Sequence, residues 1–111
     1  LSLQQAHDID FLIGTGGNFK SLIKTKNLLF PKSKKNQATL AEIKHVFDAL
    51  TRIDYYQRIK QYSLKADRAD VIIPATFTVI SLMTRLKIKK LLVSDVGLED
   101  GLLEIFKHDF K

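Results

Sequence analysis

Residues 8–19 read DIDFLIGTGGNF, an apolar run that stops at a cluster of glycines. The run over residues 8–13 predicts a strand that enters a tight turn at Gly14. Beyond the glycines, apolar residues recur at every third or fourth position, which predicts a short amphipathic helix over about 18–26. A strand, a glycine-rich turn and a helix together form the first unit of an α/β fold.

The middle of the chain carries two helix signals, after an exposed basic loop expected over residues 30–37. Thr39 and Glu42 have the spacing of a capping box, in which each side chain bonds the backbone N–H of the other residue, and apolar residues then follow at helical spacing to Leu50. A second helix is predicted over Asp54–Tyr62, where an apolar or aromatic residue stands at every third position. The two helices are expected to form a hairpin.

The last third of the chain is divided by Pro74, which lacks the N–H that a helix interior needs and biases the residue before it toward extended backbone. The segment over 67–73 is therefore expected to end there, and a new helix to run from Pro74 to about Leu86. Lys90–Ser94 predicts a strand buried on both faces, and Leu98–Phe106 predicts a closing helix. Two strands are too few for a stable parallel sheet, so the chain either supplies edges to a sheet completed elsewhere or contains further strands.

The composition is that of one compact domain spanning residues 1–111, since 45% of the residues are apolar. A formal net charge of +6 favours polyanionic ligands such as phosphate chains, nucleotides or nucleic acid. The absence of cysteine excludes a disulfide scaffold and indicates the cytoplasm. Val71–Met83, the longest apolar stretch, is shorter than the roughly 20 residues of a membrane span and is interpreted as a buried core helix. Because the chain opens at Leu1 without an initiating Met, a preceding segment is expected in the natural protein.

Five residues between the first strand and helix could hold phosphate. Glycines allow a ligand to approach the backbone closely, and a helix N-terminus adds a partial positive charge. The segment does not fit the dinucleotide or Walker patterns. It is either a phosphate-binding turn or a tight turn without a ligand, and it consists of Gly14, Thr15, Gly16, Gly17 and Asn18.

Arg68 is the second candidate site residue. Its planar guanidinium could hold an anionic group. Alternatively, Arg68 pairs with Asp67 or Asp70 and caps a helix at a domain edge.

Two other groups of polar residues have simpler interpretations. Asp95, Glu99 and Asp100 favour capping of a helix start over a metal site. No metal-binding or catalytic spacing is found among the histidines, and the two lysine clusters are interpreted as solvated surface that attracts polyanions. These residues are His7, His45 and His108, Lys32, Lys34 and Lys35, and Lys87, Lys89 and Lys90.

In their order along the chain, these segments resemble the last third of the catalytic core of the exopolyphosphatase/guanosine pentaphosphate phosphohydrolase (Ppx/GppA) family. The resemblance is carried by the glycine segment 14–17, by RADVIIPA at 68–75 and by LVSDVGLEDGLL at 92–103. It implies an α/β fold, helix-rich with a small sheet, that is a portion of a ribonuclease-H-like domain of the actin-like ATPase superfamily. The chain would be the C-terminal part of a larger two-domain phosphatase core that closes over the phosphates.

The resemblance also implies an activity, the release of terminal phosphate from inorganic polyphosphate or guanosine pentaphosphate with magnesium. Residues 14–18 occupy the place of one phosphate-binding loop, although Gly17 and Asn18 depart from its commonest wording. Glu99 stands where the family usually has Arg. The family's catalytic carboxylate and first phosphate loop lie earlier in the full-length protein, so this chain is expected to hold no catalytic residue, to hold no metal of its own and to be inactive alone. Its implied partners are the missing N-terminal part and a second copy in a homodimer.

Two alternatives remain on sequence grounds. The chain could be a small basic module that binds nucleotide or nucleic acid through its lysines without catalysis, or a dimerisation domain. No aromatic stacking platform interleaved with basic residues is visible.

Overall fold

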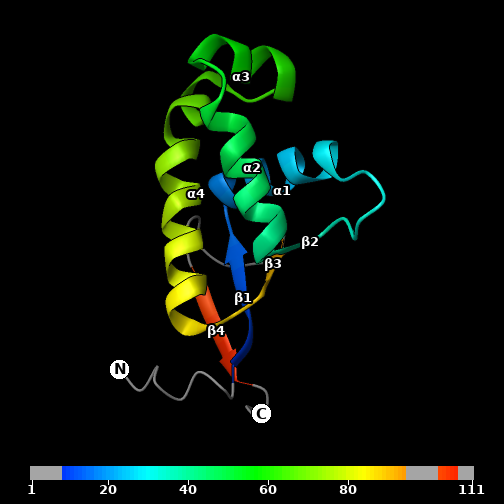
Figure 1. Cartoon of the computed structure of the whole chain (residues 1–111), viewed down its shortest axis with the longest axis vertical. Coiled ribbons are helices and arrows are strands. Elements are labelled where there is room, and N and C mark those ends of the chain that lie inside the picture. The colour runs from blue at the N-terminus through cyan, green and yellow to red at the C-terminus, as the bar shows by residue number, and fades with distance from the viewer. Residues whose placement is uncertain (1–8, 95–102, 108–111) are drawn as a thin grey trace.

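The computed structural model describes residues 9–94 and 103–107, which form four helices and four strands (Figure 1). The elements are β1 (Ile9–Thr15), α1 (Gly17–Leu29), β2 (Gln37–Thr39), α2 (Leu40–Thr51), α3 (Tyr55–Tyr62), α4 (Ala66–Leu86), β3 (Lys90–Ser94) and β4 (Leu103–Lys107).

The four strands form one sheet in the order β2-β3-β1-β4. The two central strands, β1 and β3, run parallel, and the carboxyl end of β1 at Thr15 pairs with Ser94 at the carboxyl end of β3. Each outer strand is antiparallel to its neighbour. The two strands predicted from the sequence thus form the parallel centre of the sheet, and β2 and β4 are further strands that the prediction missed.

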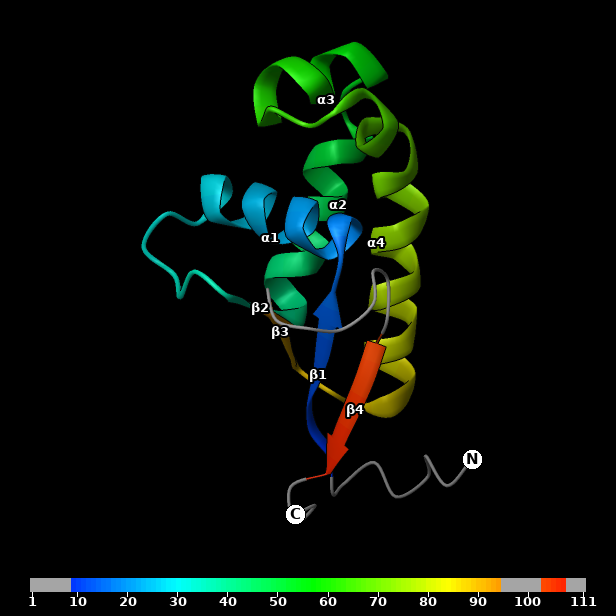
Figure 2. The ribbon, with the colours of Figure 1, turned by 180° about the vertical axis from the view of Figure 1, so that it is seen from behind.

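The core lies between one face of the sheet and the helices. Leu12 of β1 faces its register partner Leu91 of β3, and both are fully buried. Their neighbours along the strands, Phe11 and Leu92, are only half-buried, as the alternation of side chains across a strand requires. Helices α1, α2 and α3 all contact α4, and Figure 2 shows the N-terminal end of α1 beside α4.

Helix α1 is longer than the sequence predicted because a buried lysine anchors its last turn. Lys26 is fully buried, and its Nζ donates hydrogen bonds to Ser33 Oγ at 2.8 Å and to the Lys34 carbonyl at 2.6 Å. Burial lowers the pKa of Lys26 below its ordinary value of 10.5, while Glu42 raises it and Lys35 lowers it. The predicted basic loop is thus exposed but tied to α1.

The capping box at the start of α2 is confirmed. The Thr39 N–H donates to Glu42 Oε1 at 2.9 Å, and the Glu42 N–H donates to Thr39 Oγ1 at 3.1 Å. Asp54 and Gln57 form a second capping box at α3. The predicted helical hairpin is wrong, because α3 lies across the ends of α2 and α4 rather than back along α2 (Figure 1).

The predicted break at Pro74 is also wrong, because α4 runs through it from Ala66 to Leu86. Pro74 is exposed, so the carbonyl left without a helical partner lies on the solvent side. Both halves of the helix are held to the core by buried residues, Ile72 before the proline and Thr76 after it. By length and composition α4 could cross a membrane, but its buried stripe packs against the other helices while Phe77 is 57% exposed. The expected buried helix is thus a core helix with one exposed face.

The closing helix predicted over 98–106 is wrong for the part of that range that the structure describes. Residues 103–107 form β4, which pairs with β1 through the register Gly14↔Leu103. A local sequence pattern carries no information on the edge of β1 with which this segment pairs. The remaining residues of that prediction, 98–102, lie outside the described residues.

Candidate functional site

The glycine segment lies at the carboxyl end of β1, where sheets with parallel strands commonly bind ligands. The structure shortens the expected turn to a single residue. Gly14 and Thr15 belong to β1, Gly17 and Asn18 belong to α1, and Gly16 alone connects them.

Each of the three glycines is required for a different reason. Gly16 has φ 102°, a backbone conformation that other residues rarely adopt. A Cβ at Gly14 would lie 2.5 Å from Cδ1 of the buried Phe19 ring, so this glycine makes room for packing. A Cβ at Gly17 would collide with the guanidinium of Arg68. Gly16 thus allows the turn, Gly14 leaves room for core packing and Gly17 allows the close approach of Arg68.

The N-terminus of α1 has no side-chain cap bond within the described part of the chain. Gly16 is the N-cap residue, and the first turn contains no acidic residue. The first helical bond runs from the Lys20 N–H to the Gly16 carbonyl at 3.0 Å. The N–H groups before Lys20 have no acceptor within the helix, and with the helix dipole they suit an anion.

Arg68, fifty residues further along the chain, lies against this helix start. Its Nη1 donates a hydrogen bond to Asn18 Oδ1 at 2.9 Å, and its side chain is partly buried. The alternative pairing with Asp67 or Asp70 is not found, and Lys65 is the N-cap residue of α4 without a side-chain cap bond. Both sequence-derived candidates therefore meet in one place.

A pocket of about 270 Å³ adjoins this contact on the side of α1 and the segment between α3 and α4. Its lining includes Gly17 and Arg68, together with Ser63 and Leu64. Among the described residues that line the pocket, one side chain is acidic, that of Asp67, and four are cationic, those of Lys20, Lys24, Lys65 and Arg68. The site is thus strongly electropositive.

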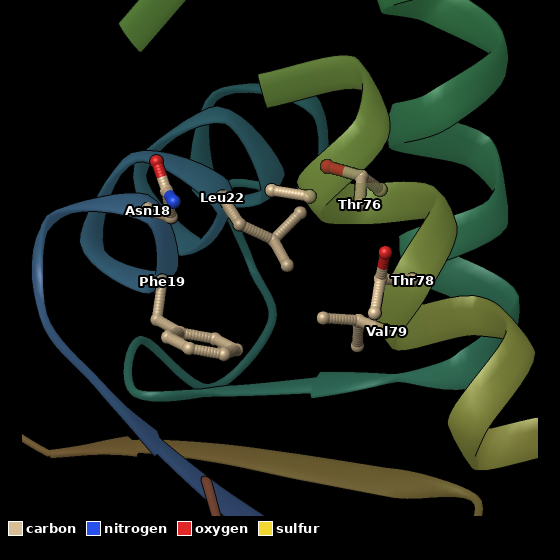
Figure 3. Close-up of a pocket in the computed structure, with 7 residues that line it drawn as sticks. Asn18, Phe19, Leu22, Thr76, Thr78 and Val79 are labelled. Carbon is tan, nitrogen blue, oxygen red and sulfur yellow. The ribbon is translucent and has the colours of Figure 1, made fainter. Parts of the chain in front are cut away.

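A second pocket, of about 200 Å³ and largely apolar, lies on the other side of Asn18, between α1 and α4 (Figure 3). In Figure 3, Phe19 and Leu22 on α1 face Val79 on α4 across it. The hydroxyl of Thr76 is buried here and has no hydrogen-bond partner within the described residues.

The other sequence candidates do not join this site. His45 is exposed, and its ring packs edge-on against that of Phe30 with 5.2 Å between the ring centroids. Lys35 Nζ bonds the Pro31 carbonyl at 2.9 Å within the basic loop. The other two histidines, together with Asp95, Glu99 and Asp100, lie outside the described residues.

Within residues 9–94 and 103–107, no group of three or more histidine, cysteine or acidic side chains could hold a metal ion. The described residues therefore do not fit the magnesium ion that the resemblance implies.

Sequence reasoning missed Lys24 and Lys65 as part of the site. Lys24 follows Lys20 by four positions, the spacing that puts two side chains on one face of a helix, and this signal was available. Nothing local in the sequence indicates that Lys65 would lie near α1.

One comparison with known proteins agrees with the resemblance drawn from the sequence. The profile of the Ppx/GppA phosphatase family matches residues 4–107, nearly the whole chain. No curated protein matches the chain. The match spans the glycine turn, Arg68 and all four strands, and the chain therefore belongs to the Ppx/GppA phosphatase family.

Proposed function

We propose that this chain supplies a phosphate-binding element to a phosphoanhydride hydrolase that releases terminal phosphate from inorganic polyphosphate or guanosine pentaphosphate. One observation carries the proposal. The glycine turn and Arg68 are far apart in the sequence, yet they meet at the N-terminus of α1, where Arg68 bonds Asn18. Membership of the Ppx/GppA phosphatase family supports a hydrolase as the parent enzyme.

The residues of the site would divide the work of holding a phosphoryl group. The backbone N–H groups of Gly17 and Asn18 would donate to its oxygens, aided by the positive end of the α1 dipole. Arg68 uses one of its donors on Asn18, and a guanidinium has five, so donors remain for an anion. The bond to Asn18 fixes the guanidinium before the ligand arrives, which reduces the entropy lost on binding.

Gly14 and Thr15 would contribute indirectly. Gly14 pairs with a residue of β3 and with one of β4, and Thr15 pairs with a residue of β3 at the end of the strand. Their backbone would therefore position the turn and would not surround the anion. The residues proposed to surround the anion are therefore Gly16, Gly17 and Asn18 of the five that the sequence suggested.

The reacting groups would come from another part of the same polypeptide. The family resemblance places the carboxylate that activates water outside this chain, and the described residues contain no group of three or more histidine, cysteine or acidic side chains that could hold magnesium. The N-terminal part of the parent would supply the catalytic carboxylate and the magnesium ligands. The parent would act in the cytoplasm as a homodimer. This chain would then bind and orient substrate but would not hydrolyse it alone.

Phosphate release from long-chain polyphosphate by the full-length parent tests this proposal. Arg68→Ala should raise KM by about tenfold or more, since a hydrogen bond to a charged group contributes about 1.5–3 kcal/mol. The matched control is Arg52→Ala, which removes the same charge from an exposed ion pair with Asp48 at the end of α2. Equal kinetics for the two variants would reject the role of Arg68, and hydrolysis by this chain alone would reject the division of the site.

The alternative of a nucleic-acid-binding module has less support. The one aromatic residue of the basic loop over 30–37 is Phe30, whose ring contacts that of His45, and the strongly exposed Tyr56 and Phe77 lie on α3 and α4. Binding of oligonucleotides that weakens steeply with salt and requires Lys32 and Lys34 would favour it.

A further inference from the structure

We propose that Arg58 is a positioning residue for the anion site: from α3 it holds the first turn of α4 in place and thereby sets where Arg68 lies against the glycine turn. This inference rests on the proposed function and deepens it, because it names what fixes the arginine that would meet the anion. Arg58 itself is not among the residues that line the pocket beside Arg68, so it would act without touching the ligand.

The first turn of α4, which carries Arg68, is fixed only weakly by its own residues. Lys65 is the N-cap residue and makes no side-chain cap bond within the described part of the chain. Its carbonyl accepts from the backbone N–H groups of both Arg68 and Ala69, at 2.9 Å each. Helix ends without a side-chain cap open more readily than helix interiors. The position of Arg68 therefore depends on contacts from outside α4.

Arg58 supplies such a contact from α3. Its Nη1 donates a hydrogen bond to the Ala69 carbonyl at 3.2 Å, and its Nε donates one to the Leu50 carbonyl at 3.0 Å. Leu50 is in the last turn of α2, where the negative end of the helix dipole favours a cation. Ala69 follows Arg68 directly in the chain. One planar guanidinium thus joins the end of α2 to the start of α4, and Figure 1 shows α3 lying across both.

Tyr55 adds a second bond from α3 to the same turn. Its hydroxyl donates to the carbonyl of Ala66, the first residue of α4, at 3.0 Å. The two bonds from α3 therefore reach carbonyls before and after Arg68 along the chain. Since α3 contains no buried residue, its polar contacts with α4 are the distinctive contribution of this helix to the fold.

The donors of Arg58 are directed at backbone and not at a carboxylate. Within the described residues Arg58 forms no ion pair, and its side chain is half-buried. Its removal would release the start of α4 without leaving an acidic side chain unpaired. A substitution at this position therefore tests placement of the backbone more directly than it tests charge balance.

The side-chain amide of Asn18 reports where Arg68 lies, because Asn18 Oδ1 accepts the bond from Arg68 Nη1 at 2.9 Å. We would record its NMR resonance in the isotopically labelled chain without ligand, and measure pyrophosphate affinity by isothermal titration calorimetry. The test variant is Arg58→Met, which keeps an unbranched apolar side chain and removes the guanidinium. The matched control is Arg52→Met, which removes the same charge from an exposed ion pair with Asp48.

Arg58→Met should move the Asn18 resonance toward its position in Arg68→Ala and weaken pyrophosphate binding about threefold to tenfold. Arg52→Met should leave the resonance in place and change the affinity by less than about twofold, since a distant exposed charge is screened. In the Arg68→Ala background, Arg58→Met should have almost no further effect on affinity. Tyr55→Phe removes a single hydroxyl and should act in the same direction by about twofold, so the inference stays testable if Arg58→Met fails to fold.

An unmoved Asn18 resonance and unchanged affinity in Arg58→Met and Tyr55→Phe would overturn the positioning role. Losses of affinity that are equal with and without Arg68 would overturn it as well. If the resonance moves in Arg58→Met, but neither this variant nor Arg68→Ala changes pyrophosphate affinity, the positioning role stands and the proposed anion site fails.

Discussion

Replacing Gly17 by Ala tests how the site is built, because the new Cβ would collide with the guanidinium of Arg68. The arginine must move, and its hydrogen bond to Asn18 at 2.9 Å is lost. The backbone at Gly17 needs no positive φ, so the substitution adds no backbone strain.

Two effects on stability oppose each other. Loss of the partly buried hydrogen bond costs about 1–2 kcal/mol, and Ala in place of Gly in a helix recovers about 0.5–1 kcal/mol. The free energy of unfolding should thus fall by about 1 kcal/mol or less. Displacing Arg68 removes one charged donor from the anion site, which should weaken tripolyphosphate binding about tenfold.

A double-mutant cycle gives the decisive assay. Calorimetry would compare the wild-type chain, Gly17→Ala, Arg68→Ala and the double variant. If Gly17 matters because it leaves room for the side chain of Arg68, then Gly17→Ala should have almost no further effect on tripolyphosphate affinity once Arg68 is removed. Additive losses of affinity, or wild-type affinity in Gly17→Ala, would refute the reasoning.

Three further predictions concern stability, each measured by urea unfolding. Gly14→Ala should destabilise the chain by about 1–3 kcal/mol, since the Cβ would press on the buried Phe19 ring; a loss below that range would contradict the packing. Thr39→Ala removes the cap of α2 and should cost about 1 kcal/mol, and Glu42→Ala should cost no more than that if the threonine is the main cap. Lys26 has a lowered pKa in the folded chain, so between that pKa and 10.5 the unfolded chain binds more protons than the folded chain. The free energy of unfolding of the wild-type chain, relative to that of Lys26→Met, should therefore rise with pH across that window. A difference that is flat or falls with pH would show that burial does not disfavour the ammonium form.

Local patterns predicted the elements whose signals lie within a few residues. The capping box of Thr39 and Glu42 and the strand over Lys90–Ser94 both depend on neighbouring side chains, and the structure has both. The strand before Gly14 and the helix after it were predicted for the same reason, although α1 extends to Leu29.

The errors arose where distant packing overrides local preference. Pro74 does not break α4 because buried residues on both sides anchor the helix, and its missing N–H is on the exposed face. Residues 103–107 form a strand because β1 has a free edge beside Gly14. Neither fact can be derived from residue spacing along the chain.

The candidate site was predicted in its parts but not in its assembly. The glycines suggested a phosphate turn, and the guanidinium of Arg68 suggested an anion contact. The structure brings them together and adds Lys24 and Lys65, whose proximity depends on the path of the chain from α3 to α4. The family match over residues 4–107 agrees with the resemblance found in the motifs.

The most direct test of a phosphate site at the glycine turn is a titration of the isotopically labelled chain with pyrophosphate, followed by the NMR shifts of its backbone amides. Saturable shifts at Gly16, Gly17 and Asn18, lost in Arg68→Ala and kept in Arg52→Ala, are the predicted result. Saturable shifts confined to the basic loop over 31–36, or none at the start of α1, would contradict a phosphate site at this turn.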